Sequence, residues 1–240
     1  MRILITNDDS ISAAQLLPLI MWCRKHGDVT TVVPKFEQSG KSHGIELHKA
    51  FEAMEVELVP GLKVWTVDST PADCVRFAIL GLKQEFDLVI SGVNKGFNMG
   101  LDIMYSGTVA AVCEAVALGV PAIAFSTSIK AYDVALQSLD RVWAFFQKHS
   151  LMEKSNLYNV NIPLEPQGIR ITRQGAPYYT DDFQHIGNNM YRPTGRCIHE
   201  DQHTMEIDTD AVVAGYISVM PMDIRRNDMP LFEQLKSLHE

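Results

Sequence analysis

The sequence predicts an α/β protein with a Rossmann-like three-layer core, a mostly parallel sheet and a smaller C-terminal α+β extension. Short runs rich in Ile, Leu and Val recur along the chain; they are too brief for amphipathic helices and suit strands buried on both faces of a parallel sheet. Stretches with helical periodicity separate these runs, as in βαβ units. With 240 residues and 46% hydrophobic content, the chain can also bury a large core.

Residues 1–150 are expected to form the Rossmann-like core, with one hairpin inserted into the strand–helix alternation. Pro18 stands inside the first helical stretch, so that helix either starts near Leu17 or is kinked. Thr70 and Pro71 form a strong helix start, a capping residue followed by proline at the first helical position. In chain order we expect a strand at 2–6, a helix at 12–26, a strand at 28–33, a hairpin of 51–59 and 62–67, a helix at 70–81, a strand at 87–91, a helix at 109–118, a strand at 122–126 and a helix at 133–149.

Residues 151–240 are expected to form the extension, which completes the sheet, projects arms and mediates oligomerisation. Strands are indicated at 157–162, 168–173 and 216–220, joined by polar, aromatic-rich segments with little helical period. Asp208, Thr209 and Asp210 are suited to capping a short helical turn.

Composition narrows the function classes. The net charge of −8 and the pI near 5.5 argue against binding of long nucleic acid. The cysteines, Cys23, Cys74, Cys113 and Cys197, are scattered, which favours reduced thiols in a cytoplasmic protein over disulfides or a zinc framework. The sequence has no signal-peptide pattern and no 18-residue apolar run, so neither export nor membrane anchoring is expected.

An acidic pair follows the first strand. Asn7, Asp8 and Asp9 come directly after the run 2–6, and open α/β sheets bind their ligands at the carboxyl ends of strands. Adjacent carboxylates repel each other, and a hard cation such as Mg²⁺ or Mn²⁺ would neutralise them. The alternative is that Asp-Asp-Ser only makes a turn and caps the next helix.

Three later segments offer partners for such a cation or for an anion. The polar loop 35–48 can place Ser39 at the cation and Lys41 or His43 at an anion, unless it is only a solvated loop. The glycine-rich stretch 92–100 can form an anion-binding nest, and Asn94 can lend an amide oxygen to a metal. The segment 105–108 precedes a helix whose amino terminus suits a phosphate, although a glycine-rich connection and an ordinary Thr cap would look the same.

Five blocks, in order and at matching spacing over about the first 130 residues, together resemble the SurE family of survival-protein 5'/3'-nucleotidases. The segment from Thr209 to Val219 also resembles that family's closing strand. The five blocks are Thr6-Asn7-Asp8-Asp9, Glu37-Gln38-Ser39-Gly40, Thr70-Pro71-Ala72-Asp73-Cys74-Val75, Ser91-Gly92-Val93-Asn94-Lys95-Gly96-Phe97-Asn98-Met99-Gly100 and Tyr105-Ser106-Gly107-Thr108-Val109-Ala110-Ala111.

The resemblance implies a metal-dependent phosphomonoesterase acting on nucleoside 5'- and 3'-monophosphates, with short polyphosphate as a secondary substrate. It also implies homodimers or homotetramers that exchange arms. One divalent ion per subunit, Mg²⁺ or Mn²⁺, would be held by Asp8, Asp9, Ser39 and Asn94. Phosphate-side residues fall on Asn98, Ser106, Gly107 and Thr108, and a loop histidine falls on His43.

In the hydrolysis that we expect, the cation polarises a phosphoryl oxygen, Asp9 takes the proton of the attacking water and His43 protonates the leaving oxygen.

The chain departs from the family pattern at a few positions. The family usually has glycine after the two acids, where this chain has Ser10, and glycine before the Thr-Pro-Ala-Asp block, where it has Ser69. The Ala-Pro-Gly that is common near the acids is Ser12-Ala13-Ala14 here. If position 10 needs a positive φ, serine costs about 1 to 2 kcal/mol there. The acidic turn is therefore the part whose geometry is most expected to differ from the family's, with lower activity as the consequence.

Three other readings compete with a metal-dependent nucleotidase. An aspartyl-phosphate phosphatase would want Asp-x-Asp, which Asp8-Asp9-Ser10 lacks. A zinc-dependent deacetylase would want His-Pro-Asp-Asp, but position 6 is Thr. A nucleotide-binding module without turnover is the third reading, and Ser10 is the feature that favours it.

Overall fold

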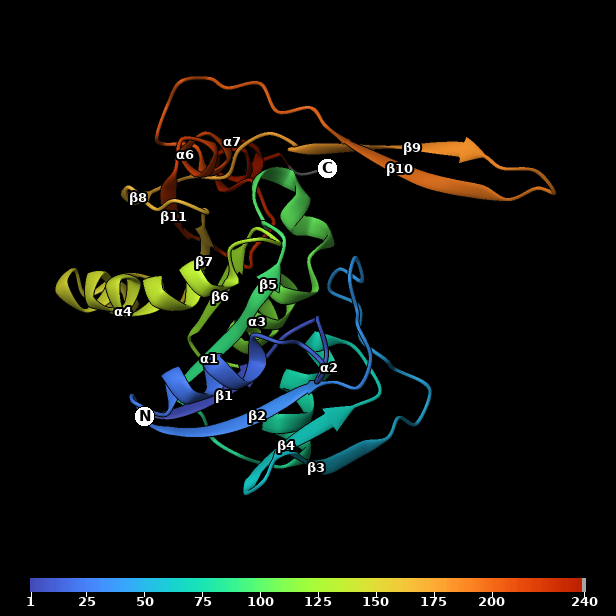
Figure 1. The fold of residues 1–240 in the computed structure, drawn as a ribbon. Helices are drawn as coiled ribbons and strands as arrows, with labels where there is room; N and C mark the ends of the chain where they lie inside the picture. The colour runs from blue at the N-terminus through green and yellow to red at the C-terminus, as the bar shows by residue number, and fades with distance from the viewer. Residues whose placement is uncertain (239–240) are drawn as a thin grey trace.

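The computed structural model describes residues 1–238, which form a nine-stranded sheet in the order β3-β4-β2-β1-β5-β6-β7-β11-β8 and a separate two-stranded arm, β10-β9 (Figure 1). The middle of the sheet is parallel, as predicted. Its strands are β1 (Arg2–Thr6), β2 (Asp28–Pro34), β4 (Leu62–Val67), β5 (Leu88–Lys95), β6 (Ala122–Thr127) and β7 (Leu157–Ile162).

Helices cover both faces of the sheet, which gives the three layers that the sequence predicts. Ile3 and Ile5 of β1 pack in one apolar cluster with α1 (Leu16–Cys23) and α4 (Tyr132–Lys148). The intervening Leu4 belongs to a second cluster, with α2 (Pro71–Arg76) and α3 (Gly107–Ala117). Because successive strand residues point to opposite faces, a fully apolar run such as Ile3-Leu4-Ile5 contributes side chains to both clusters.

The helix starts follow local chemistry. Helix α1 begins at Leu16, so Pro18 lies in its first turn, where no intrahelical N–H bond is required. Of the two predicted possibilities, a late helix start or a kink, the structure has the late start. At α2, the Thr70 hydroxyl accepts the Asp73 N–H at 3.1 Å and Pro71 takes the first position, as predicted. A π-helical turn, η1 (Phe77–Gly81), extends α2.

Antiparallel strands complete the sheet at both edges. The predicted hairpin is present as β3 (Ala53–Val59) and β4, with β3 at the edge. At the other edge, β11 (Tyr216–Pro221) pairs antiparallel with β7, and β8 (Gly168–Ile171) pairs parallel with β11. The remaining helices are the 3-10 helix η2 (Gly100–Tyr105), α5 (Leu151–Lys154), α6 (Asp208–Val213) and α7 (Met229–Leu235).

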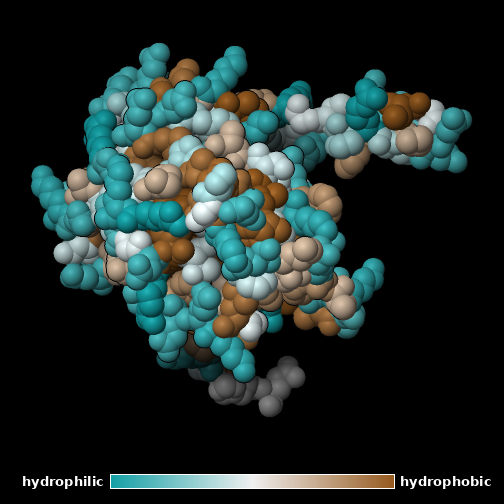
Figure 2. All heavy atoms as spheres, turned by 60° about the horizontal axis from the view of Figure 1, so that its bottom comes forward, coloured by the Kyte–Doolittle hydropathy of each residue, from teal (hydrophilic) through white to brown (hydrophobic). Residues whose placement is uncertain are grey.

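The arm is a hairpin of β9 (Tyr179–His185) and β10 (Tyr191–Cys197) that extends away from the body (Figure 1). Figure 2 shows it standing clear of the other residues, with hydrophobic side chains near its outer end. The sequence predicts arms in this region but not these two strands. Among residues 1–238, no helix is long and apolar enough to cross a membrane.

Candidate functional site

The acidic pair lies at the switch point of the sheet. Strand β1 lies between β2 and β5, so successive connections leave it in opposite directions and open a crevice at its carboxyl end. The turn after β1 is held by Asn7, whose Nδ2 donates to the carbonyl of Ser10 at 2.9 Å. Ser10 has a φ of 71°, in the left-handed region that favours glycine. The chain therefore places Asp8 and Asp9 on a tight turn at the ligand-binding edge.

Asp8 packs against the amino terminus of α3. The Thr108 hydroxyl donates to its Oδ1 at 2.6 Å, which fixes the carboxylate beside the free N–H groups of the helix start. Burial raises the pKa of Asp8, and the hydrogen bond from Thr108 opposes that effect. Gly107 permits the close approach, because a Cβ at this position would lie 3.1 Å from the Cβ of Asp8 and 3.0 Å from Cγ of Pro71.

We expect Gly107→Ala to lower phosphatase activity about tenfold with little loss of stability. The added methyl pushes Asp8 by a few tenths of an ångström, and misplacement of reacting groups by about 1 Å can cost about 100-fold. Alanine itself suits the first position of a helix better than glycine does. Phosphate release and thermal unfolding measure the two effects. Gly195→Ala is the control, since a Cβ there comes no closer than 3.4 Å to its neighbours, and equal activity of both variants would contradict the packing argument.

Asp9 connects the first strand to the end of β5. Its Oδ2 accepts hydrogen bonds from Nε2 of Gln15 at 2.7 Å and from the peptide N–H of Lys95 at 3.1 Å. Burial and, second, the neighbouring Asp8 raise the pKa of Asp9 to about 6. The residue next to Asn94 is thus in direct contact with the acidic pair.

The loop after β2 approaches the pair from the other side. The peptide N–H of Gln38 donates to the carbonyl of Asp8 at 2.8 Å, and the hydroxyl of the following Ser39 donates to Glu37 at 2.7 Å. Glu37 is close enough to raise the pKa of both aspartates. A cleft of about 500 Å³ opens here; its lining includes Asp9, Ser10, Gln15, Glu37, Lys95 and Tyr132.

Asn94 lies within β5, which runs further than the sequence predicts. The strand continues through Gly92 with an irregular register between Ser91 and Asn94. Gly92 has a φ of 128°, and a Cβ there would fall 2.2 Å from the carbonyl oxygen of Phe125, so only glycine fits. The Asn94 amide nitrogen donates to the carbonyl of Gly96 at 2.9 Å, which leaves its oxygen as the atom suited to a cation.

The four predicted ligands come from neighbouring strand ends, and their donor types suit a hard divalent cation. Asp8 and Asp9 bring carboxylates from β1, Ser39 brings a hydroxyl from the loop after β2, and Asn94 brings an amide oxygen from β5. Mg²⁺ and Mn²⁺ prefer such oxygen ligands.

Two predicted phosphate-side residues also have structural roles. Ser106 caps α3, and its Oγ accepts the N–H of Val109 at 3.1 Å. Asn98 is 7% exposed; its Nδ2 donates to Ser126 at 2.8 Å, while its carbonyl accepts the amides of Asn159 and Asn161, each at 2.7 Å. This network fixes the backbone of the loop between β5 and η2.

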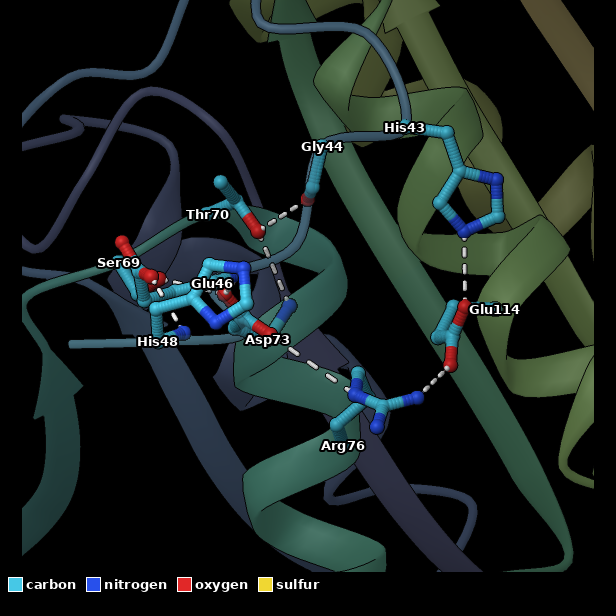
Figure 3. A network of polar contacts seen from close by, with 9 residues as sticks. All are labelled: His43, Gly44, Glu46, His48, Ser69, Thr70, Asp73, Arg76 and Glu114. Atoms are coloured by element: carbon cyan, nitrogen blue, oxygen red, sulfur yellow. Dashed lines mark hydrogen bonds and ion pairs between the residues drawn. The ribbon is translucent and has the colours of Figure 1, made fainter. Parts of the chain in front are cut away.

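A chain of polar contacts ties His43 to Glu114 of α3 and to Arg76 of α2 (Figure 3). Its Nε2 lies 2.8 Å from Glu114, and Arg76 donates to the other oxygen of that carboxylate at 2.8 Å. The hydrogen bond from His43 and, beyond it, Arg76 keep the pKa of Glu114 low against the effect of burial. Asp73 accepts the N–H of Glu46 at 2.8 Å and so ties the same loop to α2. Within residues 1–238, the structure brings His43 into no hydrogen bond with Asp8 or Asp9.

Several residues that line the crevice are absent from the predicted set, among them Gln15, Glu37, Lys95 and Tyr132. The hydroxyl of Tyr132 is buried without a hydrogen-bond partner among residues 1–238, and burial followed by the charges of Asp9, Asp8 and Glu37 raises its pKa. Glu37 could have been found from the sequence, since it is the first residue of the Glu37-Gln38-Ser39-Gly40 block. Tyr132 had no sequence signal, because only the folding of α4 brings this residue near β1.

We expect Ser10→Gly to raise the free energy of unfolding by about 0.5 to 1 kcal/mol. Relief of left-handed strain stabilises the folded state by about 1 to 2 kcal/mol. Glycine loses more backbone entropy on folding, which costs about 0.5 to 1 kcal/mol. Denaturant unfolding measures the change. Ser12→Gly, at a position without positive φ, should lower stability instead; a loss of stability in Ser10→Gly would show that the strain is smaller than the entropy of glycine and the lost hydrogen bond from the Ser12 N–H to Ser10 Oγ.

Comparisons with known proteins identify the family. The family described as survival protein SurE matches residues 3–181. The chain is 36% identical to the 5'-nucleotidase SurE of Thermoanaerobacter sp. (strain X514) over 99% of this chain and 98% of that protein. It is 37% identical to the protein of the same name from Syntrophomonas wolfei, covering 98% and 94%. The crystal structure of the SurE protein from Aquifex aeolicus superimposes with a TM-score of 0.79 at 28% identity, covering 99% of each chain. The chain therefore belongs to the SurE family.

Proposed function

We propose that this protein is a metal-dependent phosphatase that hydrolyses nucleoside 5'-monophosphates in the crevice at Asp8 and Asp9. The observation that carries the proposal is the position of Asp8, which is buried against the amino terminus of α3 and hydrogen-bonded to Thr108. A cation site and a phosphate site then adjoin each other. Relatives that match over nearly the whole chain are named 5'-nucleotidases.

Asp8, Asp9, Ser39 and Asn94 are the proposed ligands of one Mg²⁺ or Mn²⁺ per subunit. When bound, the cation supplies Lewis acidity to a phosphoryl oxygen and activates water. Gln15 and the N–H of Lys95 orient Asp9 through its Oδ2, so Asp9 is the group suited to take the proton of the attacking water.

The phosphoryl group is proposed to lie at the start of α3. The N–H groups at Gly107 and Thr108 point out of the helix end, where the helix dipole favours negative charge. The Ser106 hydroxyl is engaged in capping, so its contribution is to fix the helix start. Asn98, held by Ser126 and the asparagines of β7, positions the opposite wall.

His43 is proposed to protonate the leaving oxygen. Glu114 accepts a hydrogen bond from Nε2 of His43, which orients the ring and leaves Nδ1 as the atom that can face a substrate. Arg76 fixes Glu114 in turn. Because His43 belongs to a loop, substrate binding is the event that would bring it to the leaving group.

Phosphate release from a panel of substrates tests the proposal. With Mn²⁺ or Mg²⁺, AMP and other 5'-monophosphates should be hydrolysed, and removal of the cation by EDTA should abolish the reaction. The family resemblance extends the proposed substrates to 3'-AMP and short polyphosphate, which belong in the same panel. Unchanged rates after chelation would refute the metal-dependent reaction, whereas nucleotide binding without turnover under any divalent ion would indicate a binding module.

The C-terminal residues from 151 on are proposed to mediate assembly into a homodimer or homotetramer. Several large hydrophobic side chains of the arm are exposed, with Phe183 at 65% and Met190 at 60%, and a lone two-stranded hairpin is only marginally stable in water. Helix α7 exposes Leu231 and Phe232 as well. Phe183→Asp should lower the mass in solution, and light scattering measures it; an unchanged mass would exclude the arm as the interface.

The cytoplasm is the proposed compartment. Among residues 1–238 the cysteines form no disulfide, and Cys23 and Cys74 are buried as free thiols, which fits a reducing environment. The substrates, nucleoside monophosphates, are also those of a cytoplasmic enzyme.

A further inference from the structure

A second group of metal-ligating side chains lies outside the crevice, between the arm and the last strand of the sheet. His199 and Asp201 follow β10, and Asp210 belongs to α6. One ligand atom of each residue lies within 4.8 Å of the others. None of the three belongs to the ligand set proposed for the crevice, so the group needs its own explanation.

Asp210 has one satisfied oxygen and one unsatisfied oxygen. Its side chain is 1% exposed, and its Oδ2 accepts the peptide N–H groups of Gln202 at 3.0 Å and Thr204 at 3.2 Å. Its Oδ1 is buried and has no hydrogen-bond partner in the part of the chain that the structure describes, and the same holds for Nε2 of His199. Buried polar atoms without partners are costly and uncommon in folded proteins.

These two unsatisfied atoms face each other at 3.4 Å, which is longer than an ordinary N–H···O hydrogen bond. The distance instead matches two ligands of one ion. In tetrahedral zinc sites the Zn–N and Zn–O bonds are about 2.0 to 2.2 Å, which places adjacent ligand atoms about 3.3 Å apart. The His199 ring is held in this orientation by Tyr178, which stacks on it at 5.3 Å with an interplanar angle of 24°.

Asp201 completes the group from the exposed side. Its carboxylate contacts its neighbour His203, whose Nδ1 lies 3.1 Å from Oδ2, so it has a partner that can orient it toward an ion. Three protein ligands and one water make a four-coordinate site. Imidazole with carboxylates suits a first-row transition ion, unlike the all-oxygen donor set of the crevice.

We propose that His199, Asp201 and Asp210 bind a Zn²⁺ ion that fastens the segment after the arm to α6. The ion would satisfy Oδ1 of Asp210 and Nε2 of His199 together. It would link residues 199 and 201, at the base of the arm, to a helix that packs on β11. Zinc binding is therefore expected to stabilise the C-terminal part of the chain that carries the arm.

The test is zinc binding by the metal-free full-length chain in an Asp8→Asn/Asp9→Asn background, which removes carboxylates of the crevice. About one equivalent of Zn²⁺ should remain bound per chain, and Zn²⁺ should raise the melting temperature by about 5 to 10 °C at concentrations well above Kd. Adding His199→Gln should weaken binding more than tenfold, since even the loss of an outer partner costs about 10- to 100-fold. His185→Gln, at an exposed histidine of β9 outside the group, is the matched control and should keep the bound zinc.

Cobalt substitution in the wild-type chain gives a second readout that does not depend on the crevice variants. A four-coordinate site with imidazole gives intense visible absorption, whereas six-coordinate oxygen sites absorb weakly. The intense band should vanish in His199→Gln and Asp210→Asn and persist in His185→Gln. Absence of both stoichiometric zinc and the cobalt band, or equal binding by the His199 variant, would overturn the proposal and leave the group as a buried histidine–aspartate pair.

Discussion

Asp8→Asn is expected to lower kcat/KM for AMP by more than about 100-fold while the fold stays intact. The substitution removes one of two adjacent charges that the proposed cation needs, and loss of groups that only orient metal ligands already costs about 10- to 100-fold. Asparagine keeps the size of the side chain and an oxygen for the Thr108 hydroxyl, so the contact with α3 can persist. It also relieves the burial of a charge, which favours stability.

Steady-state phosphate release measures the loss, and thermal unfolding checks the fold. Asp28→Asn is the matched control, because Asp28 is an exposed acid at the amino end of β2, at the opposite edge of the sheet. Activity of Asp8→Asn within a fewfold of wild type would remove Asp8 from the reaction centre. An unfolded Asp8→Asn protein would show that the carboxylate is needed for structure, contrary to this prediction.

His43→Gln is expected to lower hydrolysis of AMP by about 100- to 1,000-fold, the usual contribution of a general acid. The alkoxide that leaves from a nucleotide is strongly basic and needs a proton, whereas p-nitrophenolate leaves readily without one. The same variant should therefore lose much less activity toward p-nitrophenyl phosphate.

The comparison of the two substrates separates proton donation from positioning. His48→Gln is the control. His48 is an exposed histidine on the same loop, and it joins the network through its backbone N–H and not through its ring. Equal losses on AMP and p-nitrophenyl phosphate would assign His43 to binding or loop structure, with Glu114 and Arg76 as its anchors, and would contradict the role of general acid.

The core was predictable because it is encoded locally. Fully apolar runs such as Ile3-Leu4-Ile5 indicate strands buried on both faces, and Thr70-Pro71 marks a helix start by itself. The arm was not predictable as strands, because β9 and β10 pair only with each other and are almost wholly exposed. Without a buried face, no alternation of apolar and polar residues is imposed on them.

The positions of Asp8 and Asp9 could be predicted because these residues directly follow a strand. For Ser10 the sequence raised a positive φ only as a condition, from the glycine usual in the family that it resembles, and the structure has a φ of 71° there. Tyr132 and Gln15 could not be found, because each reaches the acids from a helix start without a motif, and only the packing of α1 and α4 on the sheet places them. The network of Glu114 and Arg76 was missed for the same reason, since it joins two helices to a loop.

Side chains from three separate strand ends are proposed to gather around one divalent cation. Direct binding of Mn²⁺ tests this proposal without any substrate. Electron paramagnetic resonance or calorimetry on the metal-free chain should find one all-oxygen Mn²⁺ site, weakened at least tenfold in both Asp9→Asn and Asn94→Ala and unchanged in Asp28→Asn. An all-oxygen Mn²⁺ site that survives both crevice substitutions, or the absence of such a site in the wild-type chain, would contradict the account.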